Sequence, residues 1–124
     1  PSNFIRIQEI YKNKFDSLQK NLSSFSFNNT QTRKAMLEIY TKHGYVADPH
    51  GAVGYLGCKA YLKKNTTAHC VFLETAHPTK FLDVVEEVVK TKQALPKQIQ
   101  AIIENKKVAT TISSYSDLRA FLLL

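Results

Sequence analysis

The chain has 124 residues, of which 44% are hydrophobic and 22% are charged, and these values exclude a disordered or fibrous class. The longest purely apolar run, residues 121–124, is far shorter than the ~20 residues that cross a bilayer, so no membrane partner is expected. The net charge of +7 raises the question of a nucleic-acid partner. The lysines are spread along the chain, however, and their pairs fall where helices are expected to end. This pattern favours lysines that lie on a solvated surface, and no nucleic-acid partner is expected.

The first expected element is a helix of about five turns, because apolar residues recur at spacings of three or four. They are Phe4, Ile7, Tyr11, Phe15, Leu18 and Leu22. A loop rich in Ser and Asn follows, and a second helix is expected over residues 31–43, where Gly44 supplies the left-handed conformation that ends many helices. Asp48 and Pro49 then predict the start of a third helix, since Asp caps open amides and Pro is tolerated in the first turn.

The third expected helix, residues 49–63, is unusually rich in glycine. It contains Gly51, Gly54 and Gly57. Each glycine inside a helix costs ~1 kcal/mol relative to alanine. Their density therefore predicts the close approach of another backbone or of a bound ligand.

Residues 67–74 (TAHCVFLE) form a short apolar run of β-favouring residues, which predicts a buried strand. The run ends in a polar turn, and a helix is expected to begin near Thr79. Ligands of open α/β sheets bind just beyond the carboxyl ends of strands, so this turn is a candidate site. Two more helices are expected, one opened by Pro96 and one capped by Ser114.

These elements make a mostly helical α/β chain with one or two strands. We expect residues 1–124 to be one incomplete domain without an internal boundary, because a single strand has no sheet to join and suits a piece of something larger.

Neither a metal site nor a reactive thiol is expected. The possible ligands are Asp48, His50, His69, Cys70 and His77. No CxxC, HxxxH or HExxH pair occurs, and His69 and Cys70 are strand neighbours that face opposite sides. Cys58 and Cys70 lie away from helix N-termini that would lower a thiol pKa, so we interpret both as small core residues in a reducing cytoplasm.

Four segments resemble threonine synthase of the longer bacterial and fungal type. They are PSNFIRI (residues 1–7), GYVADPHG (residues 44–51), DPHGAVGY (residues 48–55) and ETAHPTKF (residues 74–81). The last two are the specific ones, and the order and approximate spacing of all four match that family. The resemblance covers about residues 1–82, and the remaining helices fit the family's C-terminal tail more loosely. Gly51 stands where the family motif has Thr, which weakens any role that rests on a hydroxyl there.

The resemblance implies a tryptophan-synthase-β-like enzyme of fold type II that uses pyridoxal 5'-phosphate (PLP). Its reaction, in threonine biosynthesis, converts O-phospho-L-homoserine and water to L-threonine and phosphate. In that family the Schiff-base lysine and the glycine-rich phosphate loop precede the region seen here, and neither motif is present. No lysine of this chain, Lys80 included, is therefore expected to hold the cofactor. We expect a C-terminal portion of the catalytic domain that has no catalytic residue and is inactive alone.

Within the resemblance, Thr75 is the residue expected to bind the cofactor. The turn ETAHPTKF would face the pyridine ring, and the neutral hydroxyl of Thr75 would hydrogen-bond the ring nitrogen. The alternative is that Thr75 only caps the following turn. Asp48, His50, His77 and Lys80 would order the surrounding loops, without an individual chemical role.

Two other functions stay open: a threonine-synthase-like phospholyase acting on a related phosphorylated amino acid, and a non-catalytic basic helical binding module. The family's sheet would continue into the missing N-terminal half of the same chain. We therefore expect an apolar face that this half covers, or that the chain masks by self-association.

Overall fold

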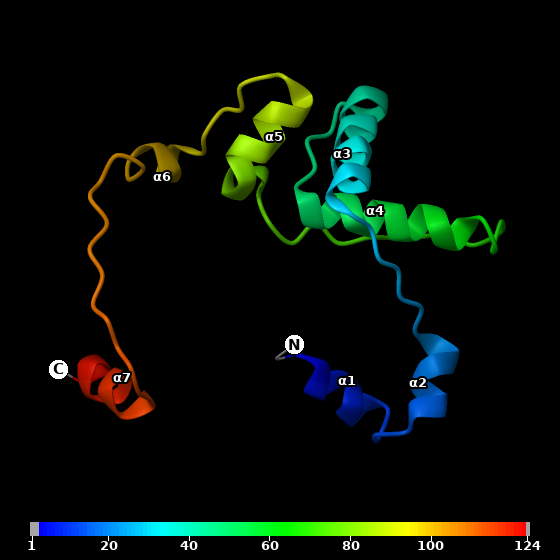
Figure 1. Cartoon of the computed structure of the whole chain (residues 1–124), viewed down its shortest axis with the longest axis horizontal. Helices are drawn as coiled ribbons and strands as arrows, with labels where there is room; N and C mark the ends of the chain where they lie inside the picture. Colours follow the sequence, from blue (N-terminus) through cyan, green and yellow to red (C-terminus); the bar gives the residue numbers. More distant parts are fainter. Residues whose placement is uncertain (1–2, 124) are drawn as a thin grey trace. The chain divides into compact units, whose positions relative to one another are not determined.

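The computed structural model describes residues 3–123, and the regular structure within them is helical (Figure 1). The chain falls into two units, Pro1–Gln93 and Ala94–Leu124. The first unit contains α1 (Phe4–Ile10), α2 (Phe15–Asn21), α3 (Asn29–His43), α4 (Pro49–Leu62), the 3-10 helix η1 (Pro78–Phe81) and α5 (Leu82–Val89). The second contains α6 (Lys97–Gln100) and α7 (Tyr115–Leu122). A single domain without an internal boundary stays a prediction.

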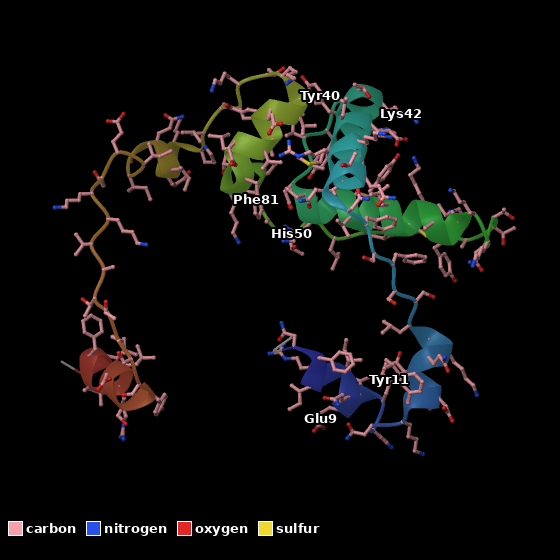
Figure 2. The ribbon with its side chains drawn as sticks, viewed as in Figure 1. Glu9, Tyr11, Tyr40, Lys42, His50 and Phe81 are labelled. Atoms are coloured by element: carbon pink, nitrogen blue, oxygen red, sulfur yellow. The ribbon has the colours of Figure 1, made fainter. Side chains whose placement is uncertain are left out.

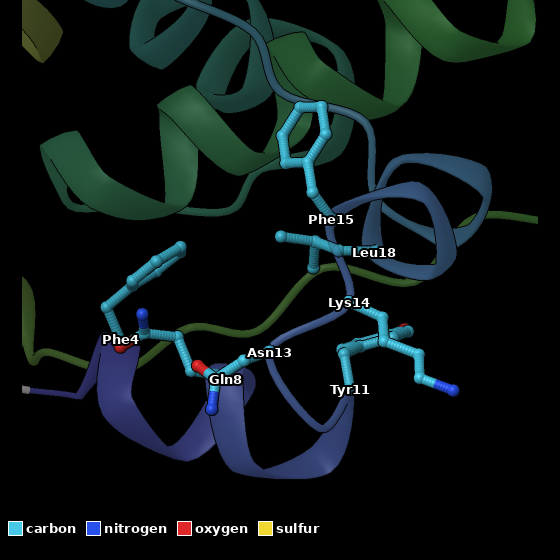
Figure 3. Close-up of a pocket in the computed structure, with 7 residues that line it drawn as sticks. All are labelled: Phe4, Gln8, Tyr11, Asn13, Lys14, Phe15 and Leu18. Atoms are coloured by element: carbon cyan, nitrogen blue, oxygen red, sulfur yellow. The ribbon is translucent and has the colours of Figure 1, made fainter.

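The prediction of one long helix at the start of the chain is wrong, because the structure has two short helices there, α1 and α2. Lys12 and Asn13 adopt positive φ angles of 50° and 55°, a left-handed conformation that an α-helix cannot contain. The apolar stripe nevertheless persists across the break. It lines a hollow between the two helices, which Figure 3 shows with Phe4, Tyr11, Phe15 and Leu18 among its walls.

Helix α3 begins and ends at side chains that satisfy its open backbone groups. Asn28 Oδ1 accepts a hydrogen bond from the Gln31 amide, and Gln31 Oε1 accepts one from the Asn28 amide, both at 2.9 Å. At the other end Gly44, with a φ of 65°, forms the predicted left-handed cap. The predicted end of this helix is confirmed, and its start lies two residues before the predicted one.

The core of the first unit lies where α3 meets α4 and α5. Its buried side chains are Ala35, Met36 and Ile39 of α3, Ala47 and Ala52 at the start of α4, and Val85 and Val89 of α5. Alanines let the helix backbones approach, and the larger side chains supply most of the hydrophobic stabilisation, about 1.5–3 kcal/mol each when fully buried.

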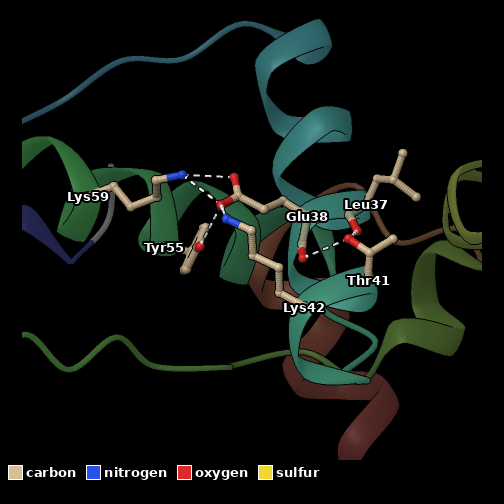
Figure 4. A network of polar contacts seen from close by, with 6 residues as sticks. All are labelled: Leu37, Glu38, Thr41, Lys42, Tyr55 and Lys59. Atoms are coloured by element: carbon tan, nitrogen blue, oxygen red, sulfur yellow. Dashed lines mark hydrogen bonds and ion pairs between the residues drawn. The ribbon is translucent and has the colours of Figure 1, made fainter.

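A polar network also joins α3 to α4, as Figure 4 shows. Glu38 Oε1 accepts hydrogen bonds from Lys42 Nζ at 2.7 Å and from the Tyr55 hydroxyl at 3.1 Å, and Lys59 Nζ lies 2.8 Å from Glu38 Oε2. Hydrogen bonds from Lys42 and then Lys59 lower the pKa of Glu38 to about 2. Glu38 is thus ionised at neutral pH and links the two helices at their surface.

The strand predicted over residues 67–74 does not form, and residues 3–123 contain no strand. Residues 68–75, called the extended segment below, run in an open conformation along α4. Their side chains alternate: Phe72 is partly buried, whereas its neighbours Val71 and Leu73 are 88% and 78% exposed. The period-two pattern is therefore real, but a strand needs a neighbouring strand and the described residues provide none.

The second unit contains two short helices. Pro96 precedes α6, which makes a single turn. Ser114 caps α7 as predicted, because its hydroxyl accepts a hydrogen bond from the Asp117 amide while the Asp117 carboxylate accepts one from the Ser114 amide, both at 3.1 Å. Among the described helices, none is long and apolar enough to cross a membrane.

Candidate functional site

The first turn of α4 is organised by Asp48, whose side chain is fully buried. Asp48 Oδ1 accepts a hydrogen bond of 2.6 Å from the His50 amide and lies 2.9 Å from His50 Nδ1. The His50 ring itself is exposed and lies beside Phe81, with ring centroids 5.1 Å apart (Figure 2). The predicted helix start is confirmed, and its cap carries a histidine to the surface.

The extended segment lies against the glycines of α4. A Cβ atom added to Gly54 would come within 3.2 Å of Phe72 Cβ, and one added to Gly51 would overlap the carboxyl of Glu74. Phe72 also meets the Tyr55 ring edge-on, at 6.1 Å between centroids. Gly51 and Gly54 therefore do have close neighbours, but these are side chains of the extended segment and not the backbone or bound ligand that the sequence predicted, and Gly57 has only an ordinary contact.

A buried pair of carboxyl groups results from this approach. Among the described residues, no hydrogen-bond donor reaches Asp48 Oδ2, Glu74 Oε1 or Glu74 Oε2 if both groups are ionised. Burial, and then the neighbouring Asp48, raise the pKa of Glu74 to about 7. Burial also acts to raise the pKa of Asp48, but hydrogen bonds from Glu74 and His50 outweigh it and leave that pKa lowered. Glu74 therefore carries the proton of the pair below neutral pH.

The remaining predicted residues lie just after Glu74. Thr75 is exposed, and its hydroxyl makes no hydrogen bond to another residue in the part of the chain described. His77, and not Thr75, caps the next turn: its Nδ1 accepts a hydrogen bond from the Thr79 amide at 3.2 Å and lies 2.8 Å from Thr79 Oγ1. Lys80 Nζ lies 5.8 Å from the centroid of the Phe81 ring.

Comparison with known proteins identifies the family. A profile described as "Threonine synthase, C-terminal" matches residues 51–122, which is more than half of the chain. The chain belongs to the threonine synthase family. A threonine synthase of Buchnera aphidicola is 37% identical over 99% of this chain, and that of Serratia marcescens is 31% identical over 99%. The threonine synthase of Saccharomyces cerevisiae is 27% identical over 80%.

This chain spans 28% of the length of the Buchnera and Serratia threonine synthases and 22% of the yeast enzyme. No solved structure matches it significantly. The matched region includes most of α4, the extended segment and the turn that follows it. Both specific motifs of the resemblance to threonine synthase, residues 48–55 and 74–81, thus lie within or at the edge of this region.

The structure brings some of the predicted site residues together. Asp48 and His50 are in direct contact, and Glu74, the residue before Thr75, interacts with Asp48. His77 and Lys80 lie in the next turn and contact Thr79 and Phe81 instead. Within residues 3–123, no group of three or more His, Cys, Asp or Glu side chains is placed to hold a metal ion.

Sequence reasoning missed Glu74 itself. Two signals pointed to it: an acidic residue at the end of an apolar run, and a glycine at position 51, where the motif of threonine synthases led us to expect Thr. Together they indicate that a side chain from elsewhere fills the space above residue 51. Only the structure shows that this side chain belongs to Glu74.

Proposed function

We propose that this chain is part of a threonine synthase, a cytoplasmic lyase of fold type II that uses PLP to convert O-phospho-L-homoserine and water to L-threonine and phosphate. The family match over residues 51–122 and the relatives that align with 99% of the chain support this proposal. Those relatives are threonine synthases, and the substrate and cofactor proposed here are the ones that the resemblance to that family implies.

The observation that carries the proposal is the junction between the two specific motifs. The turn that contains Thr75 is held against the start of α4 through the contact between Glu74 and Asp48. At this junction the Thr75 hydroxyl is exposed, neutral and not engaged by another described residue. Such a group fits the pyridine nitrogen of PLP, since a hydroxyl can donate to that nitrogen without holding it protonated as a carboxylate would.

PLP, when bound, supplies the electron sink for loss of phosphate and addition of water. In our proposal Thr75 donates the hydrogen bond to the ring nitrogen and so sets the orientation of the ring. Asp48 caps α4, His77 caps η1, and both hold the backbone on either side of Thr75 in place. His50 and Lys80 are exposed, and both lie near the Phe81 ring.

We also propose that the rest of a longer protein covers the outer face of the extended segment. Val71 and Leu73 expose apolar surface there, and the chain matches only 28% of its relatives' length. A parallel or antiparallel strand added to this segment would bury both side chains and pair its backbone. Self-association of the chain is the other way to cover the same face.

The test uses the full-length product of the gene, assayed for phosphate release and L-threonine formation from O-phospho-L-homoserine. Thr75→Val should change the absorbance of bound PLP and lower kcat about ten-fold, the effect of losing about 1.4 kcal/mol of stabilisation. Thr67→Val, the same change before the extended segment begins, is the matched control and should leave both unchanged. Phosphate release without threonine formation would indicate a related phospholyase. No phosphate release would favour the non-catalytic binding module.

A wild-type PLP spectrum and wild-type turnover in Thr75→Val would contradict the role of Thr75 while leaving the reaction itself in place. The assay of substrate turnover and the spectrum of the variant therefore test the two parts of the proposal separately.

A further inference from the structure

The buried carboxyl pair of Asp48 and Glu74 is held in a defined arrangement. Asp48 is 0% exposed, and its Oδ1 is already engaged by the amide and the ring of His50. Its Oδ2 and both oxygens of Glu74 are buried and have no donor from another described residue. Two buried carboxylates without donors repel each other and lose their hydration, whereas one shared proton turns the pair into a donor and an acceptor.

The surroundings decide which of the two groups is the acid. Asp48 accepts a backbone hydrogen bond as the N-cap of α4, a position that favours an ionised carboxylate because of the open amides and the helix dipole. At Glu74, burial and the neighbouring Asp48 carboxyl outweigh the favourable effects of the Asp48 amide and of His50, and the pKa of Glu74 is raised. The other titratable groups that act on the pair are His50, on α4, and Tyr45, on the link that precedes α4. Neither donates to Glu74, so the proton rests on Glu74.

Gly51 makes room for this arrangement. It is buried in the first turn of α4, and a Cβ atom on it would overlap the Glu74 carboxyl. The carboxyl therefore occupies the space that a side chain at position 51 would need. Because the extended segment has no neighbouring strand in the described residues, side-chain contacts such as this one hold it against α4. Thr75 follows Glu74 directly, so the place of Glu74 fixes the place of Thr75.

We propose that Glu74 is a positioning residue for Thr75: its neutral carboxyl donates a hydrogen bond to Asp48 and thereby fixes the Thr75 turn against the start of α4. Loss of the proton places two negative charges in the buried site and moves the turn away from α4. The inference rests on the proposed function only in the contact of Thr75 with PLP, since the carboxyl pair and the turn are features of the chain itself.

The first experiment follows the side-chain carboxyl of Glu74 and the backbone amide of Thr75 by NMR across pH in the full-length protein, selectively labelled and without PLP. Glu74 should titrate near pH 7, and the Thr75 amide signal should shift with the same midpoint. In Glu74→Gln the amide side chain donates to Asp48 at every pH, so this shift should disappear. A Glu74 midpoint near the ordinary value of 4.5, or a Thr75 signal that ignores the titration, would overturn the proposal.

Stability gives a second readout. The pKa of Glu74 is raised on folding, so its stabilising effect is full below about pH 4.5 and is lost as the pH rises through about 7. The urea midpoint of the wild-type chain should fall over this window, and that of Glu74→Gln should not. Parallel curves for the two proteins would count against the shared proton.

The third readout is activity of the full-length protein. Glu74→Ala should lower kcat by up to about 100-fold, the scale of a misplacement of about 1 Å. Glu74→Gln should recover most of that loss and should lack the fall in rate as the pH rises through about 7. Equal loss in both variants would overturn a positioning role. Failure of the proposed reaction would leave the NMR result unaffected, so the two failures are distinguishable.

Discussion

Replacing Gly51 with alanine should destabilise the first unit, although glycine-to-alanine changes in helices usually have the opposite effect. The φ of Gly51 is not positive, so alanine can adopt the native backbone and would by itself stabilise the fold by about 0.4–1 kcal/mol. The new Cβ atom, however, would overlap the Glu74 carboxyl. That side chain must then leave the space between α4 and the extended segment.

The net change in stability depends on the contact between Glu74 and Asp48 that is lost. Its departure leaves buried Asp48 Oδ2 without a donor, which costs about 1–3 kcal/mol. Subtracting the gain from alanine gives a loss of roughly 0–2.6 kcal/mol, centred on about 1.3 kcal/mol, for Gly51→Ala. In a Glu74→Ala background nothing obstructs the new methyl group, and Gly51→Ala should stabilise by about 0.4–1 kcal/mol. The two positions should therefore be coupled by about 1–3 kcal/mol.

The assay is urea denaturation of wild type, both single variants and the double variant, followed by circular dichroism at pH 6, where Glu74 is protonated in the wild type. Gly57→Ala is the matched control, since its Cβ atom would meet only Phe25 at 3.7 Å, an ordinary contact. It should stabilise by up to about 1 kcal/mol in both backgrounds. Additive effects of Gly51→Ala and Glu74→Ala, or stabilisation by Gly51→Ala alone, would refute this reasoning.

Met36→Ala should lower the free energy of unfolding, measured by urea denaturation, by about 2–5 kcal/mol, because Met36 is 1% exposed. Leu37→Ala, on the exposed side of the same helix, should change it by no more than about 0.5 kcal/mol. Similar losses for both variants would contradict the described core. Hydrogen bonds from Lys42 and Lys59 lower the pKa of Glu38 from 4.5 to about 2, so its contribution is full above about pH 4.5 and is lost as the pH falls through about 2. Glu38→Gln should therefore lower the free energy of unfolding at neutral pH by about 1 kcal/mol and reduce the further loss of stability at acid pH. If the dependence of stability on acid pH is unchanged in this variant, the network contributes nothing.

Local chemistry predicted the helix ends well. Gly44, Asp48 and Ser114 all cap helices at or within a residue of the expected positions, because the side chain that satisfies an open amide or the glycine that turns the chain is adjacent in sequence. The break at Lys12 and Asn13 had no such signal. Neither residue is a glycine or a proline, and helical periodicity does not report a left-handed backbone at Lys12 and Asn13.

The site was predicted in part. Asp48 and His50 stood out because the motif places them beside each other at a helix start, and their contact is short-range. The contact of Asp48 with Glu74 joins residues 26 positions apart in sequence, and no local rule relates them. The strand prediction was wrong for a related reason. Residues 68–75 do alternate between exposed and partly buried side chains, but the described residues contain no strand that pairs with them.

The open backbone of the extended segment has a consequence for the order in which the protein folds. Helices α3 and α4 are consecutive in sequence, so loop closure costs their contacts little and these contacts can form early. In our proposal the strand that pairs with residues 68–75 belongs to the rest of a longer protein, so this pairing closes a longer loop and forms later. Until that pairing forms, Val71 and Leu73 present an unpaired apolar edge, which exposes the folding chain to aggregation.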